Sequence, residues 1–354
     1  MSLVHPPLKA LATCLVALAT GPALAQDWAT REVCDVPQVA LYEDTLDAPL
    51  AELERQAAEI PNGLGRFWRI TAPGGAVSHL WGTFHSTQRE VLDLPDMVLA
   101  EIARAKTVAL EIDPVYPSRA AYRADVTHEG RYIADGQPSA YNTLSLDPRV
   151  DGWIRDRLDG IGWGRDSTDY LTLGALTEVL LWPPCEDFAS GTYPTQDTLI
   201  QTLGHIKGAR VVGLESAQRI RQKLDGTGGR SMGAAMLTVY GSYLAPVEDW
   251  KGAATGYALY LQGRIAVSMM QDRAYIESLF GEEGLDQLDY LDTWLLDERN
   301  HDFVEAAAPL LDEGGVFVAV GSFHLPGEEG MVKLFRDRGY RVERVAVPGE
   351  VQTP

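Results

Sequence analysis

The chain is poor in cysteine, in positive charge and in long apolar segments. Only three of its 354 residues are cysteines, and none has the Cys-x-x-Cys or Cys-x-x-His spacing of a structural zinc site. Thirty Lys and Arg residues stand against fifty Asp and Glu residues, so the formal net charge is −20. A field of this sign repels nucleic acids and anionic lipids, and neither is expected as a partner.

Two short signatures of known chemistry are also missing. No His-Glu-x-x-His sequence, the pattern of many zinc peptidases, occurs in the chain. The Gly-rich stretch 226–235 lacks the Lys-Ser/Thr ending of a phosphate-binding loop, and it is expected to be a turn that enters a helix. If the protein is a hydrolase, its site must be assembled from distant strands.

Residues 1–25 have the pattern of a cleaved secretion signal. Lys9 precedes an apolar run over 10–20, and the Ala-Leu-Ala at 23–25 fits the small-residue cleavage pattern. That run is shorter than the roughly 20 residues that a membrane-spanning helix needs. The sequence therefore predicts a periplasmic or secreted protein without an integral membrane segment after cleavage, in which residues 26–354 form a single domain.

Two cysteines, Cys34 and Cys185, remain after the predicted cleavage. An even pair in an oxidising compartment indicates one disulfide, which would tie the N-terminal segment to the middle of the chain. Two isolated thiols are the alternative.

Short apolar segments alternate with helical patterns along the chain. Such alternation predicts an α/β fold with a mixed, largely parallel central sheet flanked by helices. The stretch 115–300 is less strand-like and is expected to form a largely helical cap that shapes a cleft. The predicted strands cover 65–71, 77–85, 106–113, 209–216, 316–325 and 340–347, and the predicted helices between them cover 93–105, 198–208, 301–315 and 331–339.

Four of the predicted strands end in a side chain that can take part in catalysis or bind a metal. These are His85, Glu111, Glu215 and His324. In open α/β sheets, ligands bind outside the carboxyl ends of the strands, so the four side chains are expected to point toward one crevice. The histidines also stand in matching frames, Gly-Thr-Phe-His and Gly-Ser-Phe-His, in which the glycine lets the backbone turn sharply.

These residues carry a resemblance to a known family. The sequence resembles the TraB/PrgY/GumN family, and it is similar to the Tiki proteins, which are metal-dependent proteases. The resemblance spans roughly residues 65–347 and implies an exported metal-dependent hydrolase that acts on a peptide or protein. The matching motifs are LWGTFHS, VALEID, TQDTLI at 195–200, VVGLES, DERN at 297–300 and GSFHLPGEEG at 321–330.

The resemblance also implies a set of site residues. The two Gly-x-x-His motifs supply His85 and His324, the strand-end acids supply Glu111 and Glu215, and an Arg-Asn pair supplies Arg299 and Asn300. These six residues are the candidate site.

Two imidazoles and a carboxylate suit Zn²⁺, Mn²⁺ or Co²⁺. We expect His85, His324 and one glutamate to be ligands. We take Glu215 as the ligand and Glu111 as the base, although the sequence does not distinguish the two. Arg299 or Asn300 would then stabilise an oxyanion.

Each assignment has a structural alternative. A histidine at a strand end can simply bond a neighbouring loop, and both glutamates can cap the segments that follow them. Arg299 can pair with a surface acid, Asn300 can be the N-cap of a helix over 301–312, and Asp197 can cap the helix that it precedes. His79, His128 and His205 are expected outside the site, and His301 is a weaker candidate than the two strand-end histidines.

Two other functions remain open on the sequence. One is a non-catalytic protein that binds or sequesters a peptide or a metal compound. The other is a metal-free hydrolase in which a histidine and a glutamate activate water.

Overall fold

The structure is a computed structural model that describes residues 34–112, 139–180, 194–216, 218–226 and 228–352. Several predictions concern residues outside these ranges. They are the signal over 1–25, Cys185, His128, and the parts of the cap over 115–138 and 181–193.

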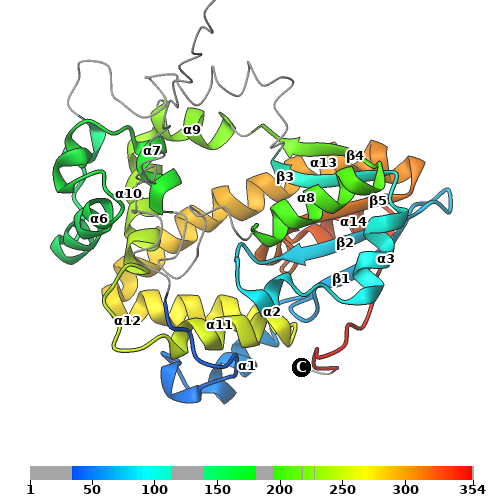
Figure 1. The fold of residues 1–354 in the computed structure, drawn as a ribbon, viewed down its shortest axis with the longest axis horizontal. Coiled ribbons are helices and arrows are strands. Elements are labelled where there is room, and N and C mark those ends of the chain that lie inside the picture. Colours follow the sequence, from blue (N-terminus) through cyan, green and yellow to red (C-terminus); the bar gives the residue numbers. More distant parts are fainter. Residues whose placement is uncertain (1–33, 113–138, 181–193, 217, 227, 353–354) are drawn as a thin grey trace, which may run out of the picture.

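A six-stranded sheet in the order β4-β3-β5-β2-β1-β6 forms one half of the protein (Figure 1). Strands β4, β3, β5 and β2 are neighbours and run parallel, whereas β1 runs antiparallel to both β2 and β6. The predicted mixed, largely parallel sheet is thus confirmed. The strands are β1 (Phe67–Thr71), β2 (Val77–Thr83), β3 (Thr107–Ile112), β4 (Arg210–Glu215), β5 (Val316–Gly321) and β6 (Arg341–Arg344).

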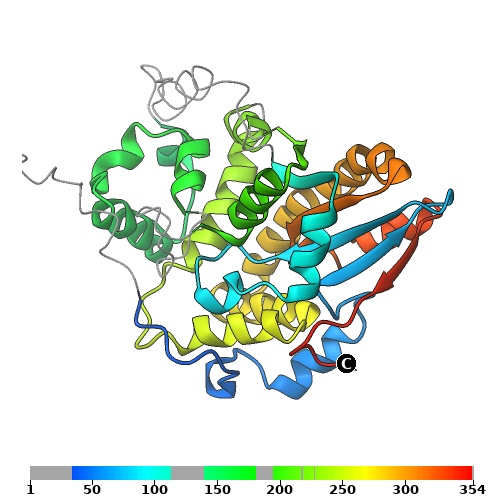
Figure 2. The same cartoon turned by 45° about the vertical axis from the view of Figure 1, so that its right-hand side comes forward.

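Helices cover both faces of this sheet (Figures 1 and 2). Helices α3 (Asp96–Arg104) and α8 (Gln196–Lys207) pack on one face, and α13 (Arg299–Glu313) and α14 (Met331–Asp337) pack on the other. Strand β5 serves both: Val318 belongs to the core with α13 and α14, and Phe317 belongs to the core with α3 and α8. Because successive side chains alternate between faces, burial on both sides explains the unbroken apolar run of this strand.

A second group of helices lies beside the sheet and has its own apolar core, which extends from Tyr141 to Leu295 in sequence. This agrees with the helical sequence pattern expected for the cap. The group contains α6 (Pro148–Gly160), α7 (Leu173–Leu180), α9 (Gln218–Asp225), α10 (Gly229–Ser242) and α12 (Ile265–Asp292). Helix α11 (Lys251–Leu261) lies beside α12, and its large buried side chains belong to separate apolar clusters. Short elements complete the fold: α1 (Leu50–Ala57), α2 (Arg89–Leu92), and the 3₁₀ turns η2 (Glu43–Thr45), η3 (Ala140–Thr143), η4 (Arg165–Asp169) and η6 (Ser322–His324).

The connection from the helical group to the sheet is continuous helix. Helix α12, which is kinked at Gly281, passes into the π-helical segment η5 (Thr293–Glu298), and α13 follows directly at Arg299. A π-helical turn holds more residues than an α-helical turn, and such turns are frequent at functional sites.

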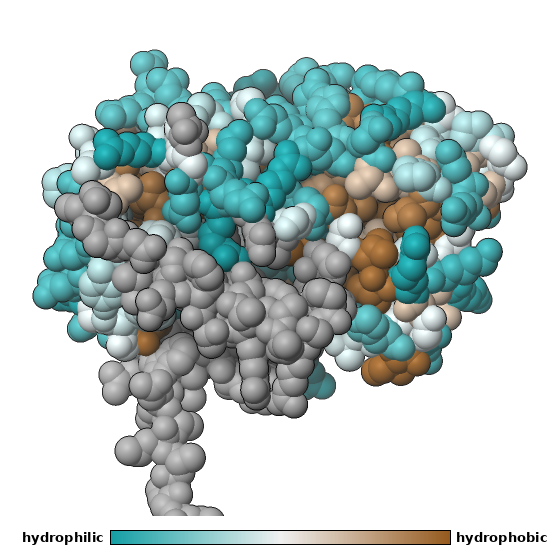
Figure 3. All heavy atoms as spheres, turned by 90° about the horizontal axis from the view of Figure 1, so that it is seen from above, coloured by the Kyte–Doolittle hydropathy of each residue, from teal (hydrophilic) through white to brown (hydrophobic). Residues whose placement is uncertain are grey.

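Hydrophilic residues cover most of the described part of the face shown in Figure 3, and hydrophobic residues gather toward its right side. The large hydrophobic side chains that are exposed among the described residues include Ile206 and Val247. None of the helices in the described ranges combines the length and the apolarity that crossing a membrane requires.

Two partly buried aspartates lie on α12, inside the helical group. Burial and the nearby charge of Asp292 raise the pKa of Asp272 to about 7. Burial also raises the pKa of Asp292 to about 7, although Arg273 opposes the shift. Between about pH 4 and pH 7 the folded protein therefore binds more protons than the unfolded chain, so this pair lowers the free energy of unfolding as the pH rises.

We predict that Asp272→Asn stabilises the protein in a pH-dependent way. The amide cannot ionise, so the melting temperature of the variant should exceed that of the wild type increasingly from pH 4 to pH 8. Thermal melts at a series of pH values measure this difference. Asp286→Asn, at an exposed site on the same helix, is the control and should show no such trend. A difference for Asp272→Asn that does not vary with pH would contradict the prediction.

Candidate functional site

The carboxyl ends of β2, β3, β4 and β5 lie at one edge of the sheet, as expected. Thr83 at the end of β2 pairs with Gly321 at the end of β5, and Ile112 on β3 pairs with Glu215 on β4. The parallel register thereby brings together side chains that are more than 200 residues apart in sequence, including His85 and His324.

Glu111 lies at the centre of this group. Its Oε1 atom is 3.7 Å from Nε2 of His324 and 4.0 Å from Nε2 of His85. The same oxygen accepts a hydrogen bond of 2.5 Å from the backbone N–H of Gly321, and the other carboxylate oxygen accepts one of 2.8 Å from Arg299. Burial would raise the pKa of Glu111, but His324, Arg299 and His85 together hold it well below its ordinary range.

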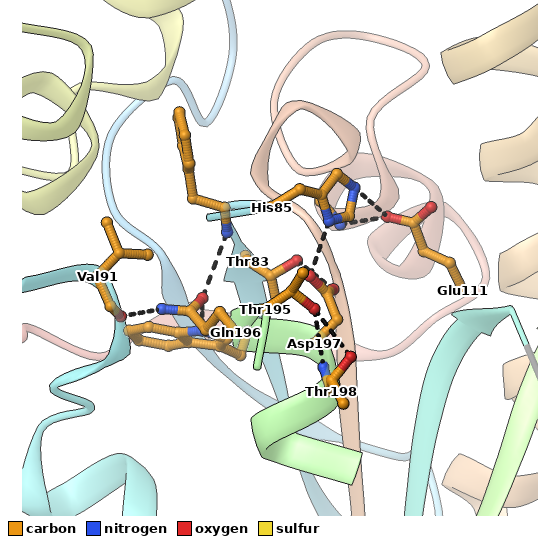
Figure 4. Close-up of polar contacts among 12 residues, drawn as sticks. Thr83, His85, Val91, Glu111, Thr195, Gln196, Asp197 and Thr198 are labelled. Carbon is orange, nitrogen blue, oxygen red and sulfur yellow. Dashed lines mark hydrogen bonds and ion pairs between the residues drawn. The ribbon is translucent and has the colours of Figure 1, made fainter. Parts of the chain in front are cut away.

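His85 is oriented by a carboxylate from the start of α8 (Figure 4). Its Nδ1 atom lies 2.7 Å from Oδ2 of Asp197, and the hydroxyl of Thr83 donates to Oδ1 of Asp197 at 2.7 Å. A carboxylate only accepts, so Nδ1 carries the proton and Nε2 faces Glu111. The charge of Asp197 raises the pKa of His85 to about 9, against the opposing effect of burial.

His324 is oriented by a neutral amide. Its Nδ1 atom is 2.7 Å from Oδ1 of Asn300, whose Nδ2 donates to the carbonyl of Glu329 at 2.9 Å. That second bond fixes the amide, so Nδ1 of His324 is the donor and Nε2 carries the lone pair that faces Glu111. Burial lowers the pKa of His324 to about 4, and the ring is neutral at neutral pH. The site therefore places a free imidazole lone pair opposite an ionised carboxylate, an arrangement in which a cation would be stabilised.

The three groups share a small space beside Gly321. A Cβ atom built on this glycine would lie 3.0 Å from Oε1 of Glu111 and 3.6 Å from both Nε2 of His85 and Cδ2 of His324. The φ angle of Gly321 is −50°, which any residue can adopt, so backbone strain does not require glycine here. A side chain would enter the space that the three groups face.

Arg299 joins the two glutamates behind this space. Its Nε atom donates to Glu215 at 2.8 Å, and its terminal nitrogen donates to Glu111, also at 2.8 Å. Arg299 is 5% exposed and pairs with Glu111 and Glu215, so the alternative in which it only pairs with a surface acid is wrong. Burial raises the pKa of Glu215, while Arg299 opposes the shift. Glu215 contacts Arg299 and Arg219, whereas Glu111 contacts both imidazoles, so the structure distinguishes the two glutamates.

The capping alternatives for two polar residues are wrong. Asn300 lies within α13 and is 1% exposed, because the π-helical segment continues into this helix without a break. The N-cap of α8 is Thr195, whose hydroxyl accepts from the N–H of Thr198, and Asp197 instead holds His85. The sequence pattern at 195–200 indicated a polar helix start but not the partner of its carboxylate.

The other histidines within the described ranges lie away from Glu111. His79 stacks on Phe67 and His205 is exposed, as predicted. His301 pairs with the exposed Glu329.

One serine lies in a sequence that matches the motif of a hydrolase nucleophile. Residues 229–233 read Gly-Arg-Ser-Met-Gly, which matches Gly-x-Ser-x-Gly. A nucleophile elbow needs a turn from a strand into a helix, whereas this segment lies within α10 and follows α9. Ser231 is exposed on the helix, and the match carries no catalytic meaning here.

The donor groups fit a divalent ion in kind and in direction. In the described part of the chain, no three His, Cys, Asp or Glu side chains stand close enough to form a ready metal site. His85, His324 and Glu111 nevertheless face one another, and two ligands each about 2.1 Å from one ion lie at most about 4.2 Å apart. The separations of 3.7 and 4.0 Å are within that reach. The Nδ1 atom of each imidazole already donates to an acceptor, Asp197 or Asn300, as is usual for histidines that bind a metal.

Loss of Arg299 should destabilise the protein strongly. Arg299→Met leaves Glu111 and Glu215 buried without their cation, and removal of one member of a buried ion pair typically costs about 3–5 kcal/mol. Urea unfolding measures the change. Because Glu215→Gln removes one of the two charges, the double variant should regain part of the loss. Arg219→Met is the matched control, since Arg219 is 37% exposed and should contribute less than about 1 kcal/mol. Equal losses for Arg219→Met and Arg299→Met would contradict this reading.

Comparison with known proteins gives one match. The profile of the TraB/PrgY/gumN family matches residues 66–344, which include all the site residues described above. No curated protein and no solved structure matches the chain significantly. The match covers well over half of the sequence, so the chain belongs to the TraB/PrgY/gumN family.

Proposed function

We propose that the protein is a metal-dependent hydrolase that cleaves peptide bonds, with His85, His324 and Glu111 as the residues that hold the ion. The observation that carries this proposal is the convergence of two Nε2 atoms on one oxygen of Glu111, with both Nδ1 atoms held from behind. Zn²⁺, Mn²⁺ or Co²⁺ suits two imidazoles and one carboxylate. Glu111 takes the place that the sequence reading gave to Glu215.

The chain's own residues position this set. Asp197 and Asn300 hold the imidazoles, and Arg299 keeps Glu111 ionised and directed toward them. The ion, when bound, would polarise a carbonyl group and lower the pKa of a water molecule toward about 7.

The nitrogens of Arg299 and Asn300 already have partners inside the protein. Arg299 donates to both glutamates and to the carbonyl of Leu295, and Asn300 donates to the carbonyl of Glu329. We therefore assign positioning to both residues in place of the expected stabilisation of an oxyanion. Glu215 in turn positions Arg299, because it accepts a hydrogen bond from the guanidinium group.

A second candidate function rests on the pair of Asp197 and His85. A histidine oriented by a carboxylate is also the arrangement of a general acid or base, and His85 is protonated at neutral pH when no ion competes for it. A metal-free hydrolase would use this pair with Glu111. The third possibility, a protein that binds a peptide or a metal compound without turnover, uses the same side chains.

Metal content and peptide hydrolysis test the proposal together. The purified protein should hold about one divalent ion per chain, and it should cleave members of a mixed peptide library in a reaction that chelation stops and added Zn²⁺, Mn²⁺ or Co²⁺ restores. His324→Ala should lose the ion. Gly321→Ala should lose both ion and activity while it stays folded, because its methyl group enters the shared space.

Gly74→Ala is the control for these variants. A Cβ atom there has no neighbour within 4 Å, so ion content and activity should match the wild type. Unchanged ion content in His324→Ala would contradict the ligand assignment. Hydrolysis that survives exhaustive chelation would favour the metal-free mechanism, and ion binding without hydrolysis would favour a binding protein.

We also propose that the protein is exported, cleaved after residue 25 and oxidised to a Cys34–Cys185 disulfide. The support is the sequence pattern of residues 1–25 and the even cysteine pair. We expect intact-mass analysis of periplasmic material to show a chain that begins at Gln26 and that gains reactive thiols only after reduction. A full-length chain in the cytoplasm, or free thiols before reduction, would contradict this expectation.

A further inference from the structure

A buried glutamine stands directly beside Asp197 at the start of α8. Gln196 is 0% exposed, although it is polar, and a buried carboxamide is tolerated only when its groups are hydrogen-bonded. It lies one position inside the N-cap Thr195 and therefore in the first turn of the helix. Its four partners come from three other segments of the fold.

The carboxamide of Gln196 forms four hydrogen bonds to these segments (Figure 4). Its Nε2 donates to the carbonyl of Val91 at 2.5 Å. Its Oε1 accepts from Nε1 of Trp81 at 3.1 Å, from the backbone N–H of Phe84 at 3.3 Å, and from the hydroxyl of Tyr260 at 2.8 Å.

Only a carboxamide in this orientation satisfies these partners. The indole and the backbone N–H of Phe84 can only donate, so they need an oxygen, and the carbonyl of Val91 can only accept, so it needs a nitrogen. Glutamate would place an oxygen against the carbonyl of Val91. Methionine would leave Val91, Trp81 and Phe84 without this bond, whereas the hydroxyl of Tyr260 would keep the carbonyl of Gly82, 2.9 Å away, as its acceptor.

The bond to Phe84 matters for the site because Phe84 precedes His85. Strand β2 ends at Thr83, and the sheet pairing to β5 ends there with it. The side chain of His85 is 51% exposed, so packing alone does not fix it. The ring of Phe84 packs on Tyr260 with its centroid 5.1 Å away, which closes the same small network.

Two consecutive residues in the first turn of α8 therefore bind the segment 83–85. Gln196 holds the backbone at Phe84, and Asp197 holds the hydroxyl of Thr83 and the ring of His85. We infer that Gln196 is a positioning residue, which sets the place of His85 relative to Glu111 by fixing the backbone before it. The consequence for ion binding rests on the function proposed above, whereas the consequence for the backbone does not.

The experiment compares Gln196→Met and Gln196→Glu with the wild-type chain. Hydrogen exchange at the amide of Phe84 reports the backbone bond, and the Nδ1 proton signal of His85 reports its bond to Asp197. Titration with Zn²⁺ alone reports the ligand set. Because residues that orient metal ligands typically contribute 10–100-fold to metal affinity, we expect Zn²⁺ affinity to fall about tenfold or more in Gln196→Met. Exchange at Phe84 should accelerate, and the Nδ1 signal of His85 should weaken.

Ser242→Ala is the matched control. Ser242 is also 0% exposed and bonds to the carbonyl of Val239 within α10, so its loss removes a buried polar contact away from His85. It should leave all three readings unchanged. If Gln196→Met does not fold, Trp81→Phe, which removes the indole N–H that donates to the carboxamide, must show the same changes at smaller size.

The outcomes separate the two claims. A Gln196→Met variant with wild-type exchange at Phe84, a wild-type His85 signal and wild-type Zn²⁺ affinity would overturn the inference. A wild-type protein that binds no Zn²⁺ would instead contradict the proposed ligand set, and exchange at Phe84 would still decide the part of Gln196.

Discussion

A single guanidinium group holds two carboxylates inside this protein, and the candidate site depends on it. Arg299 compensates part of the charge that Glu111 carries between the two imidazoles, and the burial of Arg299 is compensated in turn by the bonds that Glu111 and Glu215 accept from it. The three side chains come from two strands and one helix. The edge of the sheet and the start of α13 are therefore locked to each other by electrostatics as well as by packing.

The two histidines of the site belong to the same motif, but their Nδ1 atoms have different partners. Each histidine follows a Gly-x-x-His turn, but His85 rests on the charged Asp197 at an exposed position, whereas His324 rests on the neutral Asn300 in the interior. One imidazole therefore favours its protonated form and the other its neutral form. If an ion were held between them, only the His85 side would give up a proton, so the two imidazoles would respond differently to the same ligand.

The fold and the convergence of the histidines were predictable from the sequence because strands buried on both faces leave unbroken apolar runs. Those runs ended at His85, Glu111 and Glu215, and the sheet order then brought the ends together. The partners of these side chains were not predictable. Asp197 and Gln196 begin a helix like any polar pair, and no local pattern shows that their side chains reach the end of another strand.

The different roles of Glu111 and Glu215 were also not predictable from the sequence. Both end a parallel strand, yet only the inner strand β3, which lies between β4 and β5, places its acid beside both histidines. Strand β4 is the outermost strand on its side of the sheet, and its Glu215 contacts Arg299 and Arg219. The position of a strand within the sheet, which a single sequence does not record, decided the part of each residue.

The π-helical segment before α13 governs which way two neighbouring side chains face. Arg299 and Asn300 follow it directly, and they serve different partners, Glu111 and His324. Removal of one residue from Thr293–Glu298 would rotate everything downstream by about 100° relative to the preceding helix, carrying both side chains off their partners. Among related sequences, the number of residues in this π-helical segment should therefore vary far less than the types of amino acid that occupy it.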